Sequence, residues 1–317
     1  MTAESVSSNR IAAQRYDHAA QTAAATVITA YSTSFGMACR LLSSDVRTQV
    51  RSVYALVRVA DEIVDGASAG SGVSPEEAWD LLQELEAETL ASITRGFSTN
   101  LVVHAFSLAA RQADITDELI SPFFASMRAD LDLEIHSDAS LDQYVYGSAE
   151  VVGLMCLKIF LASSPVGPGQ EKELVSGARR LGAAFQKINF LRDLSQDYIM
   201  LGRVYIPGTT PQVFNESIKN NILDDIQGDL IAARAVIDDL PDNSRTAVLV
   251  AHDLFAELAR RLRATPADDL LTVRVRVPDT YKVFLLARAM GTARAVPWIK
   301  DITARHGIPQ SSRSSLS

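Results

Sequence analysis

The chain has 317 residues, of which 47% are hydrophobic and 21% charged, a profile typical of a globular protein that buries a large core. Its 30 basic and 38 acidic residues give a net charge of −8, which excludes nucleic-acid binding as the main activity. Eleven prolines and 16 glycines are too few for an all-β chain, which needs a turn signal about every 8–12 residues. With two cysteines and a polar N-terminus, we expect a cytoplasmic protein.

Helical periodicity dominates the chain between two weakly patterned ends. We expect a frayed N-terminus at 1–20, one domain at 21–300 and a C-terminal tail at 301–317. Apolar residues recur every three or four positions and predict helices at 24–42, 45–64, 75–93, 99–112, 115–135, 140–163, 170–201, 216–239, 242–264 and 279–294. Ser74 and Pro75 mark one helix start, as N-cap and first helical residue. The sequence therefore predicts a single all-α domain. Its most apolar stretch, 151–162, contains Lys158 and is too short to span a bilayer.

The first motif whose residues could bind a metal or a substrate lies on one face of the second predicted helix. Tyr54, Arg58, Asp61 and Asp65 follow spacings of 4, 3 and 4 and therefore share one side of the helix. Two like charges one turn apart destabilise a helix by about 0.2–0.5 kcal/mol, so the pair indicates a compensating cation. Carboxylate oxygens suit Mg²⁺, which completes its shell with water and substrate phosphate. The alternative is a solvated face in which Arg58 is an ordinary ion-pair partner.

The same carboxylate spacing recurs in the helix predicted at 170–201. Gln186, Asn189, Asp193 and Asp197 follow spacings of 3, 4 and 4, among apolar neighbours. Polar residues at core-type spacing are costly to bury without partners, so this face is either wet or binds something charged. Two helices that each present an aspartate pair inward would form the carboxylate rim of a diphosphate–metal site.

These motifs, in this order, resemble those of the squalene/phytoene synthase family over roughly residues 30–290. The matching segments are 32–35, 51–65, 127–131, 144–153, 186–197 and 202–207, the last of which reads Gly-Arg-Val-Tyr-Ile-Pro. The second aspartate motif leading into that segment is the most specific part of the match. The resemblance implies an all-α isoprenoid-synthase fold with a central cavity.

The resemblance also implies roles for individual residues. The metal, Mg²⁺ with Mn²⁺ as an alternative, would be held by Asp61, Asp65, Asn189, Asp193 and Asp197. Substrate-binding residues would be Ser34, Phe35, Tyr54, Arg58, Gln186, Asn189, Arg192, Arg203, Arg274 and Lys282. The catalytic set would be Asp61, Asp65, Asp193, Asp197, Tyr144 and Arg58, with Tyr54 and Tyr144 along the carbocation path. The open alternatives are a core aromatic for each tyrosine and a solvated surface lysine for Lys282.

The implied reaction is a head-to-head condensation of two prenyl diphosphates through a cyclopropyl intermediate. The motif Asp-Glu-Ile-Val-Asp-Gly at 61–66 is similar to that of phytoene synthases, so we favour two geranylgeranyl diphosphates as substrates and phytoene as product. The first alternative is a dehydrosqualene or squalene synthase that uses two farnesyl diphosphates. An alternative of another class is a catalytically inactive relative that binds a lipid or a protein partner.

Cofactor and partner expectations follow from the same reading. The Gly-rich segment 66–72 follows a helix rather than a strand, so it is no dinucleotide fingerprint, and we expect no NADPH. The end of the sequence, 312–317, shows no apolar anchor. We expect peripheral contact with the inner face of the membrane during product release, and a carotenoid desaturase as the downstream partner.

Overall fold

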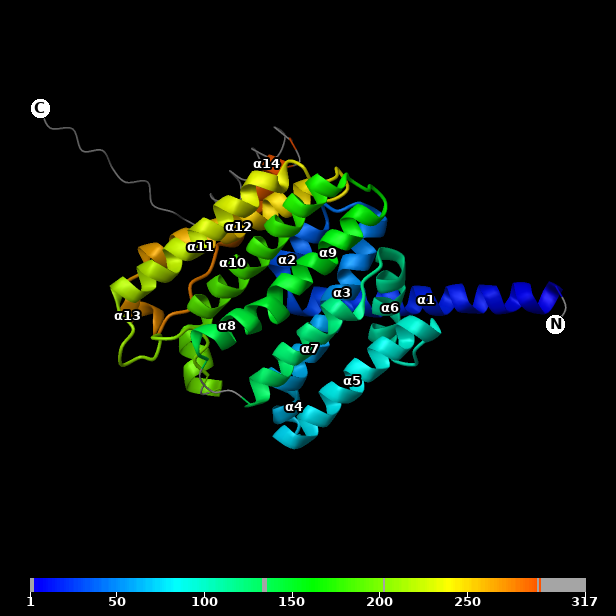
Figure 1. Ribbon diagram of the computed structural model, residues 1–317, viewed down its shortest axis with the longest axis horizontal. Coiled ribbons are helices and arrows are strands. Elements are labelled where there is room, and N and C mark those ends of the chain that lie inside the picture. The colour runs from blue at the N-terminus through cyan, green and yellow to red at the C-terminus, as the bar shows by residue number, and fades with distance from the viewer. Residues whose placement is uncertain (1–2, 133–135, 202, 290, 292–317) are drawn as a thin grey trace, which may run out of the picture.

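The computed structural model describes residues 3–132, 136–201, 203–289 and 291, and its regular structure is helical (Figure 1). The elements are α1 (Ala3–Tyr31), α2 (Thr33–Cys39), α3 (Ser44–Asp65), α4 (Ala67–Gly70), α5 (Pro75–Arg95), α6 (Leu101–Ala113), α7 (Asp117–Asp132), α8 (Asp138–Val145), the π-helical turn η1 (Tyr146–Glu150), α9 (Val151–Ala162), α10 (Pro168–Leu201), α11 (Glu216–Ile237), α12 (Arg245–Ala264), α13 (Ala267–Leu270) and α14 (Asp279–Ala289). No β-strand occurs within these ranges. The all-α class predicted from the sequence is confirmed.

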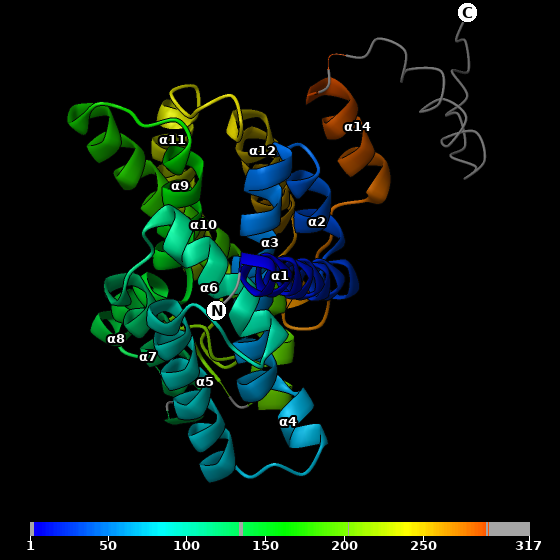
Figure 2. The same ribbon diagram turned by 90° about the vertical axis from the view of Figure 1, so that its right-hand side faces the viewer.

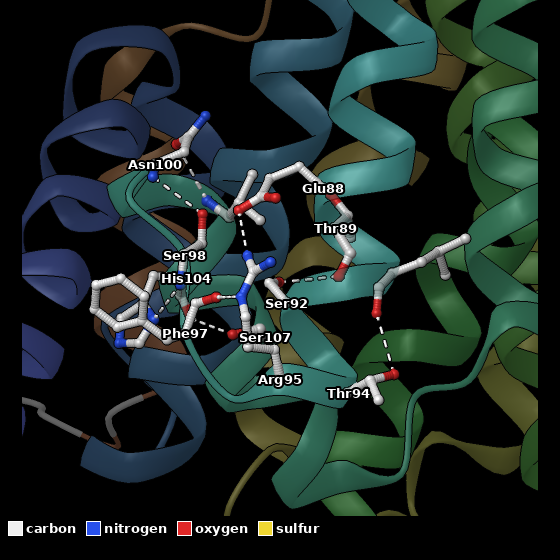
Figure 3. Close-up of polar contacts among 12 residues, drawn as sticks. Glu88, Thr89, Ser92, Thr94, Arg95, Phe97, Ser98, Asn100, His104 and Ser107 are labelled. Atoms are coloured by element: carbon white, nitrogen blue, oxygen red, sulfur yellow. Dashed lines mark hydrogen bonds and ion pairs between the residues drawn. The ribbon is translucent and has the colours of Figure 1, made fainter.

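The starts and ends of α5 and α6 follow from local side-chain chemistry. Ser74 and Glu77 form a reciprocal capping box with Pro75 at the start of α5, as the sequence predicts, and Gly96 ends the helix at φ 81°. Figure 3 shows the junction that follows: Arg95 Nε donates to the carbonyl of Phe97 at 2.8 Å. These bonds fix the sharp turn from α5 into α6.

The N-terminus differs from the frayed segment expected at 1–20, because α1 begins at Ala3. Its outer part projects from the body of the molecule, whereas its inner part is anchored (Figure 1). Tyr16 Oη donates to the carbonyl of Ser98 at 2.8 Å, and His104 Nε2 lies 2.9 Å from Asp17 Oδ1. Helix α1 contacts α3 and α6 mainly through alanines, whose small side chains give little hydrophobic periodicity. The sequence pattern therefore predicts only the part of α1 from residue 24 onward.

The predicted helix at 24–42 is divided in the structure. Ser32 has an extended backbone and its side chain accepts the N–H of Phe35, so it ends α1 and caps α2. Other helix ends lie within a few residues of those predicted. The predicted helical residues 133–135, 290 and 292–294 lie outside the described part of the chain, as does the tail predicted at 301–317.

Helix α10 is the central element and contacts α9, η1, α11 and α12. Its approach to η1 and α9 is close enough to require glycine. A Cβ added at Gly182 would lie 2.6 Å from the carbonyl oxygen of Ala149, and one at Gly153 would lie 2.8 Å from that of Ala178. Backbone therefore packs on backbone along this seam, and Figure 2 shows α9 and α10 side by side.

The segment Asp138–Ala162 runs as one helix through α8, η1 and α9. Its 25 residues and mean hydropathy of 1.6 make it, within the described residues, long and apolar enough to cross a membrane. The sequence analysis predicts a helix at 140–163 but considers only its most apolar part, 151–162, as a possible span. The segment packs against α3, α7 and α10, and 39% of its most apolar window is buried. Length and composition alone are therefore weak evidence for a membrane span.

Candidate active site

The two aspartate pairs lie in the C-terminal turns of α3 and α10 and influence one another. Burial and the neighbouring Asp65 carboxylate raise the pKa of Asp61 to about 8. Burial, then Asp193 and Asp65, raise the pKa of Asp197 to about 7. Arg203 pairs with Asp65 and lines the same small pocket as Asp197. The two pairs, more than 120 residues apart in sequence, therefore lie near one another, and we call these four carboxylates the rim. Their role as metal ligands stays a prediction.

Arginines partly neutralise this rim. Arg203 Nη1 lies 2.5 Å from Asp65 Oδ1, and Arg274 Nε lies 2.6 Å from Asp193 Oδ1. Arg192 contacts the same carboxylate, with Nε 3.0 Å from Asp193 Oδ1. Three predicted diphosphate contacts thus lie directly against the predicted metal ligands. Charge-assisted bonds of this kind are the strong ones, and they hold the rim together.

Arg58 sits on the outer side of the first pair. Its guanidinium pairs with Glu62, lies 3.9 Å from Asp61 Oδ2, and stacks over the ring of Tyr31 at 4.4 Å. The neighbouring Tyr54 stacks on Phe35, with ring centroids 5.6 Å apart. The rings of Phe35 and Tyr54 therefore form an aromatic wall beside the rim.

The donor atoms at the rim fit a hard cation. Asn189 Oδ1 is buried and has no hydrogen-bond partner within the described residues, although it lies one turn before Asp193. An unpaired amide oxygen next to crowded carboxylates can form part of the oxygen shell of a cation. Mg²⁺ prefers oxygen ligands of this kind. No group of three His, Cys, Asp or Glu side chains is preassembled for a metal in the part of the chain that the structure describes. The ligand set would therefore need water or substrate oxygens to complete it.

A buried carboxylate, Asp130 of α7, links the rim to two tyrosines and was not predicted as a site residue. Its Oδ2 accepts from Tyr144 Oη at 2.8 Å and its Oδ1 from Tyr205 Oη at 2.9 Å. Arg203 Nη1 donates to Tyr205 Oη at 3.2 Å, which connects the network to Asp65. Burial raises the pKa of Asp130 to about 7, although Arg203 opposes the rise.

A sequence signal for this network existed. Asp130 follows Phe123, Phe124 and Met127 on the buried face of α7, and an acidic residue on such a face requires partners. The family-like segment 127–131 already contained it, but spacing alone could not show that Tyr205 and Tyr144 would reach the same carboxylate.

The remaining predicted residues are placed as follows. Tyr144 is buried, and its hydroxyl points to Asp130. Gln186 is partly buried on α10, one turn before Asn189. Lys282 pairs with Asp279 of its own helix, with Nζ 2.9 Å from Oδ1, and makes no described contact with the rim. The side chain of Ser34 lies outside the described part of the structure.

An apolar cavity of about 260 Å³ opens between α2, α3, α9, α10, α11 and α12. Its wall includes Val57, one turn before Asp61, and Phe185, one turn before Asn189. Small residues form part of its wall, among them Cys39, Ala149 and Ala251. The apolar cavity therefore begins one helical turn from the charged rim, which suits a ligand with an anionic head and a hydrocarbon tail.

Comparisons with known proteins agree with this arrangement. The chain is 27% identical to the 4,4'-diapophytoene synthase of Staphylococcus haemolyticus, covering 73% of this chain and 78% of that one. It is 27% identical to the 15-cis-phytoene synthase of Paracoccus sp., covering 74% and 80%. A ligand-bound dehydrosqualene synthase structure superposes with a TM-score of 0.73 at 22% identity, covering 88% and 97%. Because the squalene/phytoene synthase family model also matches residues 28–280, the chain belongs to that family.

Proposed function

We propose that this protein is a Mg²⁺-dependent prenyltransferase that joins two geranylgeranyl diphosphates head to head to form phytoene, the first committed step of carotenoid biosynthesis. The observation that carries the proposal is the junction of the apolar cavity with two facing aspartate pairs. Hydrocarbon chains gain free energy by leaving water for such a cavity, whereas diphosphates need cations at its mouth.

In this mechanism, Mg²⁺ held by the four aspartates and Asn189 would take up negative charge on each departing diphosphate. Arg192, Arg203 and Arg274 lie against the same carboxylates and offer N–H donors to diphosphate oxygens. The apolar wall excludes water, so the carbocation left behind is attacked by the double bond of the second chain instead of by water. The faces of Phe35 and Tyr54 stabilise positive charge near the rim.

Both condensation stages lose a diphosphate, and the final carbocation loses a proton to leave a central double bond. The protein's part is to hold the two chains side by side and to keep the second diphosphate in reach of the rim after the first has left. With proton loss as the last step, the reaction needs no hydride donor, and we propose that NADPH is not used.

The chain length of the substrate is the open part of this proposal. The relatives named diapophytoene synthase and phytoene synthase are equally similar to this chain, so farnesyl diphosphate is the second candidate. Small cavity residues, such as Cys39 and Ala251, favour the longer chain because short side chains leave room for it. The presence of both aspartate pairs argues against an inactive relative.

The test is product analysis by mass with C15 and C20 diphosphates, each with Mg²⁺ and with or without NADPH. We expect phytoene from the C20 substrate and no change on adding NADPH. A reduced hydrocarbon formed only with NADPH would indicate a squalene-type enzyme, and turnover of the C15 substrate alone would indicate a dehydrosqualene synthase. Release of no diphosphate from either substrate would indicate an inactive relative.

The proposal extends to the surroundings of the enzyme. We place it in the cytoplasm, in peripheral contact with the inner face of a membrane, with a carotenoid desaturase as the downstream partner. Partial burial of the apolar segment Asp138–Ala162 supports contact with an apolar phase. Fractionation of cells that express the protein, with and without the desaturase, tests this part separately.

A further inference from the structure

Helix α9 lies between two apolar spaces, and Lys158 is its one charged residue. One face, which includes Gly153, Cys156 and Phe160, lines the inner cavity. The adjacent face, which includes Leu154 and Leu161, lines a separate outer groove of about 350 Å³. A surface helix ordinarily carries polar residues on its outer face, so an apolar outer face requires a reason.

The two spaces meet at one residue. Leu157 lines both the cavity and the groove, and it is 4% exposed. Leu157 is therefore part of the wall that separates the interior from the outside. The groove continues over Leu119 of α7 and Pro165 in the loop before α10. Lys158, whose Nζ lies 3.6 Å from Asp114 Oδ2, and Glu171 are its charged members.

The groove lies at the end of α10 opposite to the aspartates. Val175 lines the groove, and Asp193 follows 18 residues later, about 27 Å along the helix at ~1.5 Å per residue. A product that has lost both diphosphates has no group that the charged rim can bind. To leave by the rim, a pure hydrocarbon would have to pass carboxylates and water, at the full cost of exposing its apolar surface.

We propose that the hydrocarbon product leaves the cavity past Leu157 and enters the groove formed by α7, α9 and the start of α10. This inference rests on the proposed function, because it requires a product that lacks a polar head. The rim then admits and discharges the diphosphates, while the far end of the cavity discharges the hydrocarbon. The apolar outer face of α9 is the surface over which that chain travels.

The experiment measures release separately from chemistry. One turnover is run with geranylgeranyl diphosphate and Mg²⁺, the enzyme is separated from free diphosphate, and transfer of the retained hydrocarbon to phosphatidylcholine vesicles is followed. Leu161→Trp fills the groove without lining the cavity, and Leu157→Ala widens the passage. Ile231→Trp, on the exposed surface of α11, is the matched control.

We expect Leu161→Trp to slow transfer to vesicles about fivefold or more while the first turnover changes less than about twofold, because single-turnover kinetics separate chemistry from release. Leu157→Ala should speed transfer, and Ile231→Trp should match the wild type. Thermal unfolding and the conservative Leu161→Met control for damage to the fold.

Two outcomes overturn the inference while the proposed function stands. One is an unchanged transfer rate in a folded Leu161→Trp protein. The other is an equal loss in the first turnover and in transfer, which would mean that the variant only deforms the cavity. Absence of Mg²⁺-dependent diphosphate release in the wild type overturns the proposed function and this inference together.

Discussion

The two halves of α10 show how one helix serves two kinds of chemistry. From Leu174 to Gly182 it lines the cavity with apolar and small side chains, and the space beside it is left unfilled. From Gln186 to Asp197 it crowds polar groups against another set of carboxylates. The apolar half borders an unfilled cavity, and the polar half carries carboxylates that repel one another. The prenyl chain of a prenyl diphosphate would fill the cavity, and the cations bound with its diphosphate would neutralise the carboxylates.

This contrast predicts that substitutions in the polar half of α10 act mainly on turnover, whereas those in the apolar half act mainly on packing and on the chain length of the substrate. The first change is Asp193→Asn in the polar half, or Asp61→Asn in the carboxylate pair of α3. Each should lower turnover at least about 100-fold with the fold intact, because a single group that stabilises developing charge is worth ~3–4 kcal/mol. Steady-state rates at saturating Mg²⁺ measure the effect.

The matched control for these variants is Asp238→Asn, which removes an aspartate whose side chain is 69% exposed and which pairs with Arg234 on α11. It should leave turnover unchanged. Near-normal activity in Asp61→Asn or Asp193→Asn would remove that helix from the metal assignment.

The second change, Asp130→Asn, tests whether the buried network supports the polar half. The amide keeps one acceptor for two tyrosine hydroxyls, so one of Tyr144 and Tyr205 loses its partner. Leaving a buried group unsatisfied costs about 1–3 kcal/mol, and the loss of orientation at Arg203 should lower turnover about tenfold. Denaturant unfolding and kcat are the measurements. Tyr205→Phe, which removes a single hydroxyl, should give a smaller loss, and an equal or greater loss would show that Asp130 is not the centre of the network.

The third change, Arg58→Lys, asks whether the arginine contacts substrate or only its neighbours. Lysine keeps the charge but loses the planar fork that serves Glu62, Asp61 and the face of Tyr31 together. We expect a clear fall in kcat/KM, about five- to tenfold, with little change in thermal stability. Full activity with a normal KM would make Arg58 a structural ion-pair partner.

The pH dependence of the metal-free protein follows from the crowded carboxylates. The pKa values of Asp61, Asp130 and Asp197 are raised to about 8, 7 and 7 in the folded state, against 3.8 ordinarily. A raised acid pKa means that the folded state binds protons more tightly, so stability should fall as pH rises from about 4 to 8. Chemical denaturation at pH 5, 7 and 9 measures this slope, and a rise in stability over that range would contradict it.

Metal should reverse the trend, because cation ligands must be deprotonated. In the presence of Mg²⁺ and inorganic diphosphate, binding should tighten between pH 6 and 8 and release protons. Calorimetry in two buffers of different ionisation enthalpy counts those protons. Binding without proton release would mean that the carboxyl groups with raised pKa values are not the metal ligands.

The sequence reveals the polar half of the site more completely than the apolar half. Asp193 and Asp197 stand out because polar residues at core spacing break the apolar pattern. In the structure Asp197 lines a small pocket with Arg203, the partner of Asp65. Tertiary partners escape such reasoning: Arg274 reaches Asp193 from 81 positions away, and Asp130 gathers tyrosines from two other segments. Only the folded chain defines these distances.

The fold shows the same division. Helices with strong periodicity or clear caps, such as α3 and α5, were predicted within a few residues. The part of α1 before residue 24 gave no signal because its contacts depend on small side chains and on Tyr16 and Asp17, which reach the α5–α6 junction. The cavity was likewise unpredictable in detail, since an empty space depends on which glycines let two backbones meet.

The smallest expected effect comes from the border between the two halves, where Gly182→Ala can be set against Gly228→Ala. At Gly182 an added Cβ would lie 2.6 Å from the carbonyl oxygen of Ala149 and 3.1 Å from the Cα of Glu150, so two backbones must move apart. Such overpacking costs about 1–3 kcal/mol. At Gly228, on α11, nothing lies within 4 Å of the added Cβ, and alanine should stabilise the helix by about 0.5–1 kcal/mol.

Thermal unfolding should therefore show a lower Tm than the wild type for Gly182→Ala and a higher Tm for Gly228→Ala. Because Gly182 also lines the cavity one turn before Gln186, its substitution should reduce turnover of the C20 diphosphate more than that of the C15 diphosphate. Equal gains in Tm for the two variants would show that the seam between α10 and η1 can relax. The contrast between the polar and the apolar half of α10 would then depend on side chains alone. In that case the Gly182→Ala variant should not discriminate between the C20 and C15 diphosphates.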